Sequence, residues 1–126
     1  MSGLEAAPVI GFVLTRDRRA GRQFQSDVLG LTLAREDDFA AMFETGGMEL
    51  RVTSVEVHTP HPQVVIGWTV VDTSETVLDL SERGVTFSVY PGLGQDEVGI
   101  WTSPDGKMRV AWFKDPYGTV LSLTQG

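Results

Sequence analysis

The sequence predicts an α+β fold in which two βαβββ modules follow one another in a single domain. Three observations carry this prediction. Residues 9–12, Val-Ile-Gly-Phe, reappear as residues 65–68, Val-Ile-Gly-Trp. Each copy is followed by a helix-length segment that ends at a glycine, and each half then closes with strands separated by turns. A chain of 126 residues has the usual size of one domain, so the repeat predicts two modules within one domain.

The first strand and the helix of each module are predicted from their boundaries. Each repeated segment continues into an apolar or β-branched run that ends at an aspartate, Asp17 or Asp72. An aspartate before a helix accepts hydrogen bonds from the amide groups of the first turn, so both are expected to be N-caps. The helices are expected over residues 20–29 and 74–83, because Gly30 and Gly84 follow and glycine readily adopts the left-handed C-cap conformation.

The remaining strands follow in the same order in both halves. Alternating segments at 31–33 and 85–87 come first, then strands at 39–43 and 110–113, and after a turn the final strands at 48–55 and 119–124. The proline-bearing stretch 57–63 is expected to link module 1, residues 8–56, to module 2, residues 64–125. Residues 90–106 add three glycine- or proline-bearing turns, which predict a loop and an extra hairpin.

Composition and charge exclude several classes of partner. A net charge of −7 repels the phosphate backbone of nucleic acids and anionic membrane surfaces. The absence of cysteine excludes disulfides, cysteine-bound zinc and a thiol nucleophile. No apolar run approaches the roughly 20 residues that span a bilayer, and the start of the chain lacks the pattern of a secretion signal. A cytoplasmic protein without nucleic-acid or membrane partners is therefore expected.

Two motifs connect the chain to a known superfamily. The end of the first helix resembles the pattern FYxxvLGL, and the last hairpin resembles the pattern F.DPdGn.l.l. The matching residues are Phe24, Asp27, Val28, Leu29, Gly30 and Leu31 in the first motif and Phe113, Asp115, Pro116, Gly118 and Leu121 in the second. On these residues the chain resembles the glyoxalase/bleomycin-resistance, or vicinal oxygen chelate, superfamily over nearly its whole length. The resemblance implies mixed sheets that curl around a shared cavity, commonly in a homodimer.

The resemblance also implies where a metal ion would bind. In the enzymes of the superfamily, His or Glu side chains from the first and last strands of each module hold a divalent metal. Those positions fall here on Gly11 or Ile10, Gly67 or Ile66, Arg51 and Ser122, with Glu49 replacing Arg51 in a register two residues earlier. At best one of these side chains is a metal ligand, so no metal site and no cofactor are expected. The metal-free, bleomycin-sequestering branch of the superfamily fits better.

The candidate ligand-binding residues are those expected to point into the cavity. Alternation along residues 48–53 places Glu49, Arg51 and Thr53 on one face and Leu50 and Val52 on the other. The polar face is expected to line the cavity, and the same count directs Ser122 inward. Aromatic rings suit flat ligands, and Phe12 is expected to occupy in module 1 the place of Trp68 in module 2. The full candidate set is Phe12, Glu49, Arg51, Trp68, Trp101, Trp112 and Ser122.

Three functions are compatible with this pattern. The first is binding of a small planar or amphipathic organic molecule in a metal-free cavity, with or without a reaction that needs no metal. The second is a metal-dependent lyase, isomerase or dioxygenase with an atypical ligand set, such as Glu49 with a histidine. The third is a non-catalytic interaction module. His58 and His61 lie in the linker and are expected to be solvated, and residues 95–97, Gln-Asp-Glu, are interpreted as surface residues or as an acceptor at the cavity mouth.

Overall fold

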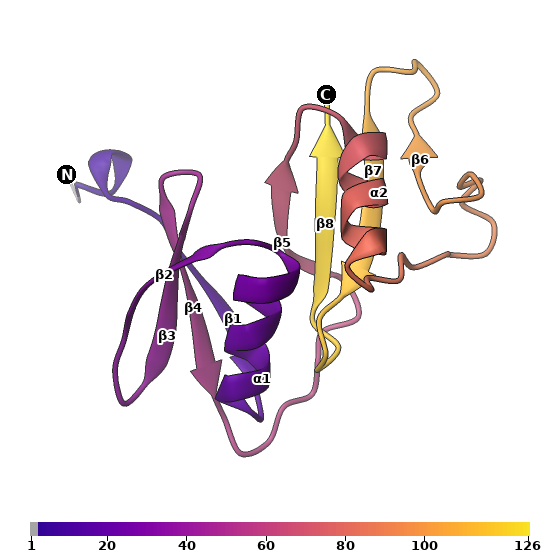
Figure 1. Cartoon of the computed structure of the whole chain (residues 1–126). Helices are drawn as coiled ribbons and strands as arrows, with labels where there is room; N and C mark the ends of the chain where they lie inside the picture. The colour runs from indigo at the N-terminus through magenta and orange to yellow at the C-terminus, as the bar shows by residue number, and fades with distance from the viewer. Residues whose placement is uncertain (1–2) are drawn as a thin grey trace. The chain divides into compact units, whose positions relative to one another are not determined.

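The computed structural model describes residues 3–126 and divides the chain into two compact units, Met1–Thr59 and Pro60–Gly126 (Figure 1). The boundary lies within the proline-bearing stretch 57–63. The elements of the first unit are η1 (Leu4–Ala6), β1 (Ile10–Thr15), α1 (Arg18–Gln23), the π-helix η2 (Phe24–Val28), β2 (Thr32–Glu36), β3 (Ala40–Thr45) and β4 (Met48–Ser54). The elements of the second unit are β5 (Val64–Thr69), α2 (Thr73–Glu82), β6 (Trp101–Thr102), β7 (Arg109–Lys114) and β8 (Val120–Gln125).

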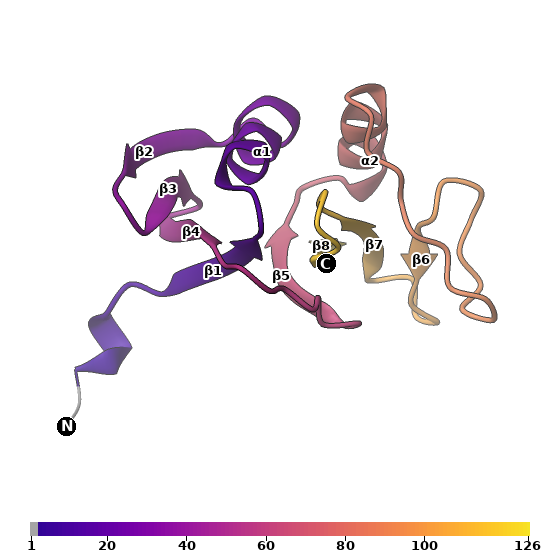
Figure 2. The ribbon, with the colours of Figure 1, turned by 90° about the horizontal axis from the view of Figure 1, so that it is seen from below.

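The first unit is a four-stranded mixed sheet with one helical layer. Its strand order is β1-β4-β3-β2, in which β1 is parallel to β4 and the other pairs are antiparallel. Helix α1 lies on one face of this sheet (Figures 1 and 2). The contact is close, since a Cβ added to Gly21 of α1 would lie 2.9 Å from Cγ1 of Val52. Val52 and Leu50 are fully buried there, so they form the core between helix and sheet.

The second unit repeats this topology with the order β5-β8-β7-β6, in which β5 is parallel to β8. Helix α2 covers one face of the sheet (Figure 2) and contributes Val77 and Leu80 to the core. The two βαβββ patterns predicted from the sequence are confirmed. The strand expected over residues 85–87 is wrong, because this segment makes only a single bridge between Phe87 and Phe113. The second strand of this module is instead the two-residue β6.

The residues predicted to cap the helices make the expected contacts. Oδ1 of Asp17 accepts hydrogen bonds from the amides of Arg19 and Ala20, and Oδ1 of Asp72 accepts one from the amide of Glu75. Gly30 ends the first helical segment with a φ of 76°. The first segment begins two residues earlier than expected and changes from α-helix to π-helix over Phe24–Val28.

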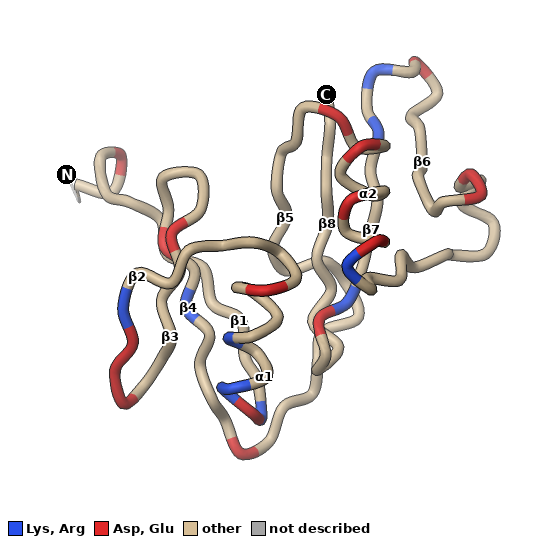
Figure 3. The backbone as a smooth tube through the Cα atoms, viewed as in Figure 1, with Lys and Arg blue, Asp and Glu red and all other residues tan. Residues whose placement is uncertain are grey.

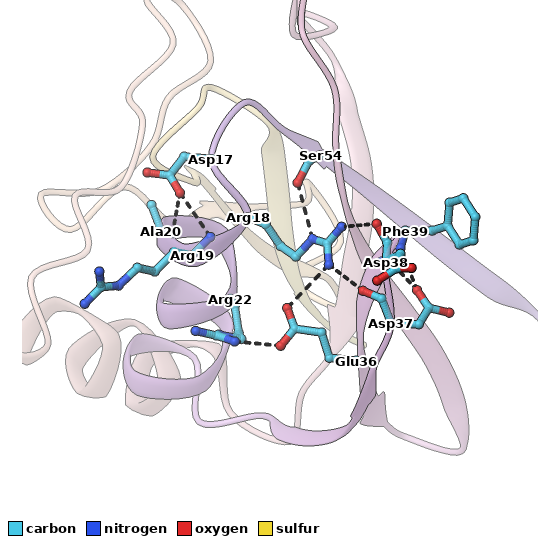
Figure 4. A network of polar contacts seen from close by, with 11 residues as sticks. Asp17, Arg18, Arg19, Ala20, Arg22, Glu36, Asp37, Asp38, Phe39 and Ser54 are labelled. Carbon is cyan, nitrogen blue, oxygen red and sulfur yellow. Dashed lines mark hydrogen bonds and ion pairs between the residues drawn. The ribbon is translucent and has the colours of Figure 1, made fainter.

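Arg18 ties the first helix to the turn between β2 and β3 (Figure 4). Its guanidinium donates to the carbonyl oxygens of Asp37 and Asp38 at 2.5 and 2.7 Å, while Arg22 forms a 2.6 Å ion pair with Glu36. The Asp37 carboxylate accepts the amide hydrogens of residues 39 and 40, which lowers the pKa of Asp37. Figure 3 shows acidic residues gathered at the turn between β2 and β3. Arg18 and Arg22 of α1 both have their partners at this turn, so their role is structural.

No helix within residues 3–126 is both long enough and apolar enough to cross a membrane.

Candidate functional site

Each sheet has one face that its own helix does not cover. In the first unit we call this the first open face. It carries alternate side chains of β1 and β4, namely Ile10, Phe12, Leu14, Glu49, Arg51 and Thr53. The predicted alternation along β4 is confirmed, because Leu50 and Val52 are fully buried while their neighbours on the other face are partly exposed. The register places Phe12 directly beside Arg51.

Glu49 lies between two arginines on the first open face. Its Oε2 is 2.6 Å from Nε of Arg51, and its Oε1 is 2.8 Å from an Nη of Arg35. The hydrogen bond from Arg51, with further support from Arg35, lowers the pKa of Glu49 below its ordinary value. The carboxylate therefore stays ionised at neutral pH, and both of its oxygen atoms are engaged.

Arg51 is held by a carboxylate on one side and by an aromatic ring on the other. Its guanidinium carbon lies 6.0 Å from the centroid of the Phe12 ring, within the range of a cation–π contact. Phe12 is 55% exposed, so most of its ring is open to contact. Glu49 bonds the Nε group of Arg51, which leaves the two Nη groups of this guanidinium available as donors for an anionic or carbonyl group.

The second open face is the corresponding face of the second unit. It carries Val64 and Gly67 of β5, Trp101 of β6, Trp112 of β7, and Val120 and Ser122 of β8. Ser122 lies between Trp112 on one neighbouring strand and Gly67 on the other. A Cβ added to Gly67 would lie 2.2 Å from Oγ of Ser122, so the glycine makes room for the serine side chain. Ser122 is consequently 7% exposed.

A hollow of about 270 Å³ opens on this second face. It is lined by Pro62, Gln63, Val64, Tyr90, Leu93, Trp112 and Val120. The Tyr90 ring stands edge-on to Trp112, with centroids 5.7 Å apart and planes inclined by 86°. The lining residues are mainly apolar or aromatic, and Tyr90 and Gln63 are the two whose side chains carry polar groups. Such a surface suits a small flat or amphipathic ring.

Trp68 lies on the opposite face of the second sheet from Trp112. It pairs with Leu123, whereas Gly67 pairs with Ser122. The expected equivalence of Phe12 and Trp68 is therefore wrong, and Gly67 occupies the place of Phe12. The sequence contains the signal, since six residue steps lead from Gly11 to Asp17 but only five from Gly67 to Asp72. Counted back from the capping aspartate, Phe12 matches Gly67.

The loop residues Tyr90 and Leu93 were not expected at the site, and Gln63 was assigned only to the linker. The sequence of the turn, Tyr-Pro-Gly-Leu, predicted a loop but gave no indication of which strand it would cover. The bond between the amide of Ser88 and the carbonyl of Trp112 attaches this loop to β7. The hollow thus depends on a long-range contact between the loop and the sheet.

The positions at which the superfamily's enzymes bind metal do not offer a ligand set. Gly11 pairs with Leu50 on the helix side, so the first-strand position on the open face is Ile10. In the second unit, Ile66 pairs with Leu121 on the helix side, so the first-strand candidate on the open face is Gly67, which lies beside Ser122. Both Glu49 oxygens bond to guanidinium groups, whose charge repels a cation. Within residues 3–126, no three His, Asp or Glu side chains lie close enough together to hold a metal ion. The donors present do not fit a divalent metal.

Solved structures with the same fold support the predicted resemblance. No protein-family model matches the chain. No curated protein sequence matches it either. The structure of a glyoxalase/bleomycin resistance protein/dioxygenase from Alicyclobacillus acidocaldarius is similar, with a TM-score of 0.70, 17% identity and coverage of 94% of this chain and 90% of that one.

Two further structures show the breadth of activities found on this fold. A lactoylglutathione lyase from Agrobacterium tumefaciens has a TM-score of 0.71 at 15% identity, covering 96% of this chain and 94% of that one. A fosfomycin resistance protein from Listeria monocytogenes has a TM-score of 0.74 at 11% identity, covering 95% and 93% of the two chains. The resemblance predicted from the two motifs is confirmed, and the chain has the glyoxalase/bleomycin-resistance fold.

Proposed function

We propose that this chain, which has the glyoxalase/bleomycin-resistance fold, binds a small flat or amphipathic organic molecule without the help of a metal ion. The observation that carries the proposal is the hollow on the second open face, where Tyr90 and Trp112 form two aromatic walls. A volume of about 270 Å³ lies just below the usual range of ligand pockets, so it favours a ligand of one or two rings.

The first open face is a separate candidate surface, described on the first unit alone. Arg51, held by Glu49 and placed beside the Phe12 ring, offers a cation next to an aromatic surface. A carboxylate or carbonyl group on a ring would be recognised by such a pair. Trp101 and Ser122 share the second open face with Trp112 and are included as candidate contacts. Trp68 is left out, because it lies on the helix side of its sheet.

The donor chemistry separates this proposal from the metal-dependent alternative. The solved relatives include a lyase and an antibiotic resistance protein, so the fold by itself does not choose between catalysis and binding. Glu49 is the one acidic side chain among the inherited metal positions, and its oxygens already bond to Arg35 and Arg51. This arrangement favours binding without metal. A homodimer and a cytoplasmic location stay predictions from the sequence.

The anionic dye 8-anilinonaphthalene-1-sulfonate, whose naphthalene is a flat pair of fused rings, tests the proposal by fluorescence titration. Tyr90→Ala removes one wall and is expected to weaken binding by about 2- to 12-fold, the equivalent of one aromatic contact. Phe39→Ala is the matched control, because Phe39 is a ring that is 78% exposed and lies outside the proposed site. Equal affinity in wild type and Tyr90→Ala would refute the proposed hollow.

The candidate surface on the first unit is tested separately, with the Glu49→Ala/Arg51→Ala double variant. It is expected to bind the dye more weakly while its thermal midpoint stays almost unchanged, because both side chains are partly exposed. Arg19→Ala on the exposed side of α1 is the control for loss of a positive charge. Elemental analysis of protein purified without chelators addresses the alternative, since a stoichiometric divalent metal would support the metal-dependent function instead.

A further inference from the structure

We propose that Gln95 is a positioning residue that sets the Tyr90 ring against Trp112 and thereby shapes the hollow. Its Oε1 accepts the Tyr90 amide hydrogen at 2.6 Å, and its Nε2 donates to the carbonyl oxygens of Ser88 and Gly99 at 2.8 and 2.7 Å. As a statement about ligand binding, this inference rests on the proposed function. As a statement about the ring pair, it rests on these contacts alone.

A carboxamide is the chemical group that this loop requires. The three backbone groups around Gln95 are one amide donor and two carbonyl acceptors. A glutamine side chain offers one acceptor oxygen and a nitrogen with two donor hydrogens, so it satisfies all three. A carboxylate has no donor for the two carbonyl groups, and an apolar side chain has neither kind of group. Gln95 is therefore a half-buried clamp inside its own loop.

The clamp acts on Tyr90 because the backbone of this residue is fixed from both sides. Its amide bonds to Gln95, and its carbonyl oxygen accepts the amide hydrogen of Leu93 across a turn. Gly92 in this turn has a φ of 85°, which glycine adopts without strain. With its backbone held in this way, the Tyr90 side chain leaves the loop in one direction.

The same clamp connects the loop to the sheet beneath the ring pair. Gln95 bonds the carbonyl oxygen of Ser88, and the amide of Ser88 bonds the carbonyl oxygen of Trp112 at 2.8 Å. The Tyr90 backbone and the Trp112 backbone are therefore joined through a short series of hydrogen bonds that passes through one side chain. Loss of the Gln95 carboxamide removes the link at Tyr90 and the link at Ser88 together.

Gln95→Met tests the inference, because methionine has a similar length but cannot make these hydrogen bonds. The readout is near-ultraviolet circular dichroism, which is sensitive to the fixed geometry of the Tyr90–Trp112 pair. Gln95→Met is expected to remove most of the signal that Tyr90→Ala removes, and the double variant is expected to lose no more than Tyr90→Ala alone. Gln23→Met makes the same change on the exposed surface of α1 and should leave the spectrum unchanged.

Two results would overturn the inference. One is a full near-ultraviolet signal in folded Gln95→Met protein, and the other is a loss that adds independently to that of Tyr90→Ala. If Gln95→Met does not fold, amide hydrogen exchange in the wild-type protein takes its place. The Tyr90 amide is expected to be protected although it lies outside the sheets, and exchange at the rate of an unstructured peptide would overturn the inference. Neither readout uses a ligand, so failure of dye binding alone counts only against the proposed function.

Discussion

Replacing Gly21 by alanine sets two effects against each other in the first unit. Alanine is a better helix former than glycine by about 1 kcal/mol, so the substitution would stabilise an isolated helix. In this protein the added Cβ would lie 2.9 Å from Cγ1 of Val52 and 3.3 Å from Cγ2 of Thr15. Both neighbours are β-branched and almost completely buried, so neither can rotate away into solvent.

The size of the packing effect decides the sign. Inserting a methyl group into a closely packed core costs about 1–3 kcal/mol, which exceeds the gain in helix propensity. Gly21→Ala is therefore expected to lower the free energy of unfolding by about 1 kcal/mol after the helix gain is subtracted. In a Val52→Ala background the closest contact is absent, so the same substitution is expected to become stabilising by up to about 1 kcal/mol.

Urea unfolding followed by far-ultraviolet circular dichroism measures this reversal of sign. The proteins compared are the wild type, the two single variants and the double variant. Coupling between the two positions is the quantity of interest, and it is expected to be about 1 kcal/mol or more. If Gly21→Ala stabilises the protein to the same extent in both backgrounds, the helix does not contact the sheet as closely as the structure indicates. The explanation given for this glycine would then be wrong.

Two other predictions concern charged side chains. Asp17→Ala and Asp72→Ala should each lower the free energy of unfolding by about 1 kcal/mol in urea titrations. Serine at either position should retain most of the capping. An alanine variant as stable as the wild type would contradict the capping role. The pKa of Glu49 lies below its ordinary value, so its ion pairs stabilise the fold fully above that value and are lost as the pH falls through the lowered pKa. A small difference in urea midpoint between wild type and Glu49→Gln should therefore be present at pH 7 and shrink as the pH falls through the lowered pKa, and a difference that does not change with pH would contradict this.

Local signals in the sequence predicted the helix ends and the last hairpin correctly. Asp17 and Asp72 act within three residues of themselves, and Gly30 adopts the expected positive φ. The last turn is equally local, since Oδ1 of Asp115 accepts the amide hydrogens of Tyr117 and Thr119. Such contacts depend on neighbouring residues only, so the sequence is sufficient to predict them.

The face of the sheet on which a side chain lies, and the residue with which it pairs, were harder to predict because both depend on the register of the strands. The alternation along β4 gave the correct face for Glu49 and Arg51, but the aligned repeat gave the wrong face for Trp68. A shift of one residue in a strand moves every side chain to the other face. The bulge between Val64 and Ile66 adds a second change of register in β5 that no local pattern indicates.

The loop of the second unit was predicted only as a loop. The role of Gln95 depends on where the backbone groups of residues 88, 90 and 99 lie, and these positions are set by attachment to β7. The strand expected over residues 85–87 failed for a related reason. Its alternating pattern is compatible with a sheet, but pairing needs a partner strand in register, and only Phe87 finds one.

The segment from Gly67 to Asp72 is one residue shorter than the segment from Gly11 to Asp17, and this difference decides which side chains reach the open face. The capping aspartate fixes the C-terminal end of the strand. The number of residues before it therefore decides on which face of the sheet each preceding side chain lies. Gaining one residue there would move the Trp68 indole from the helix side of its sheet to the second open face, and losing it again would do the reverse. A change of one residue in the length of this segment therefore exchanges the side chains that line the open face, although the amino acids of the strand stay the same.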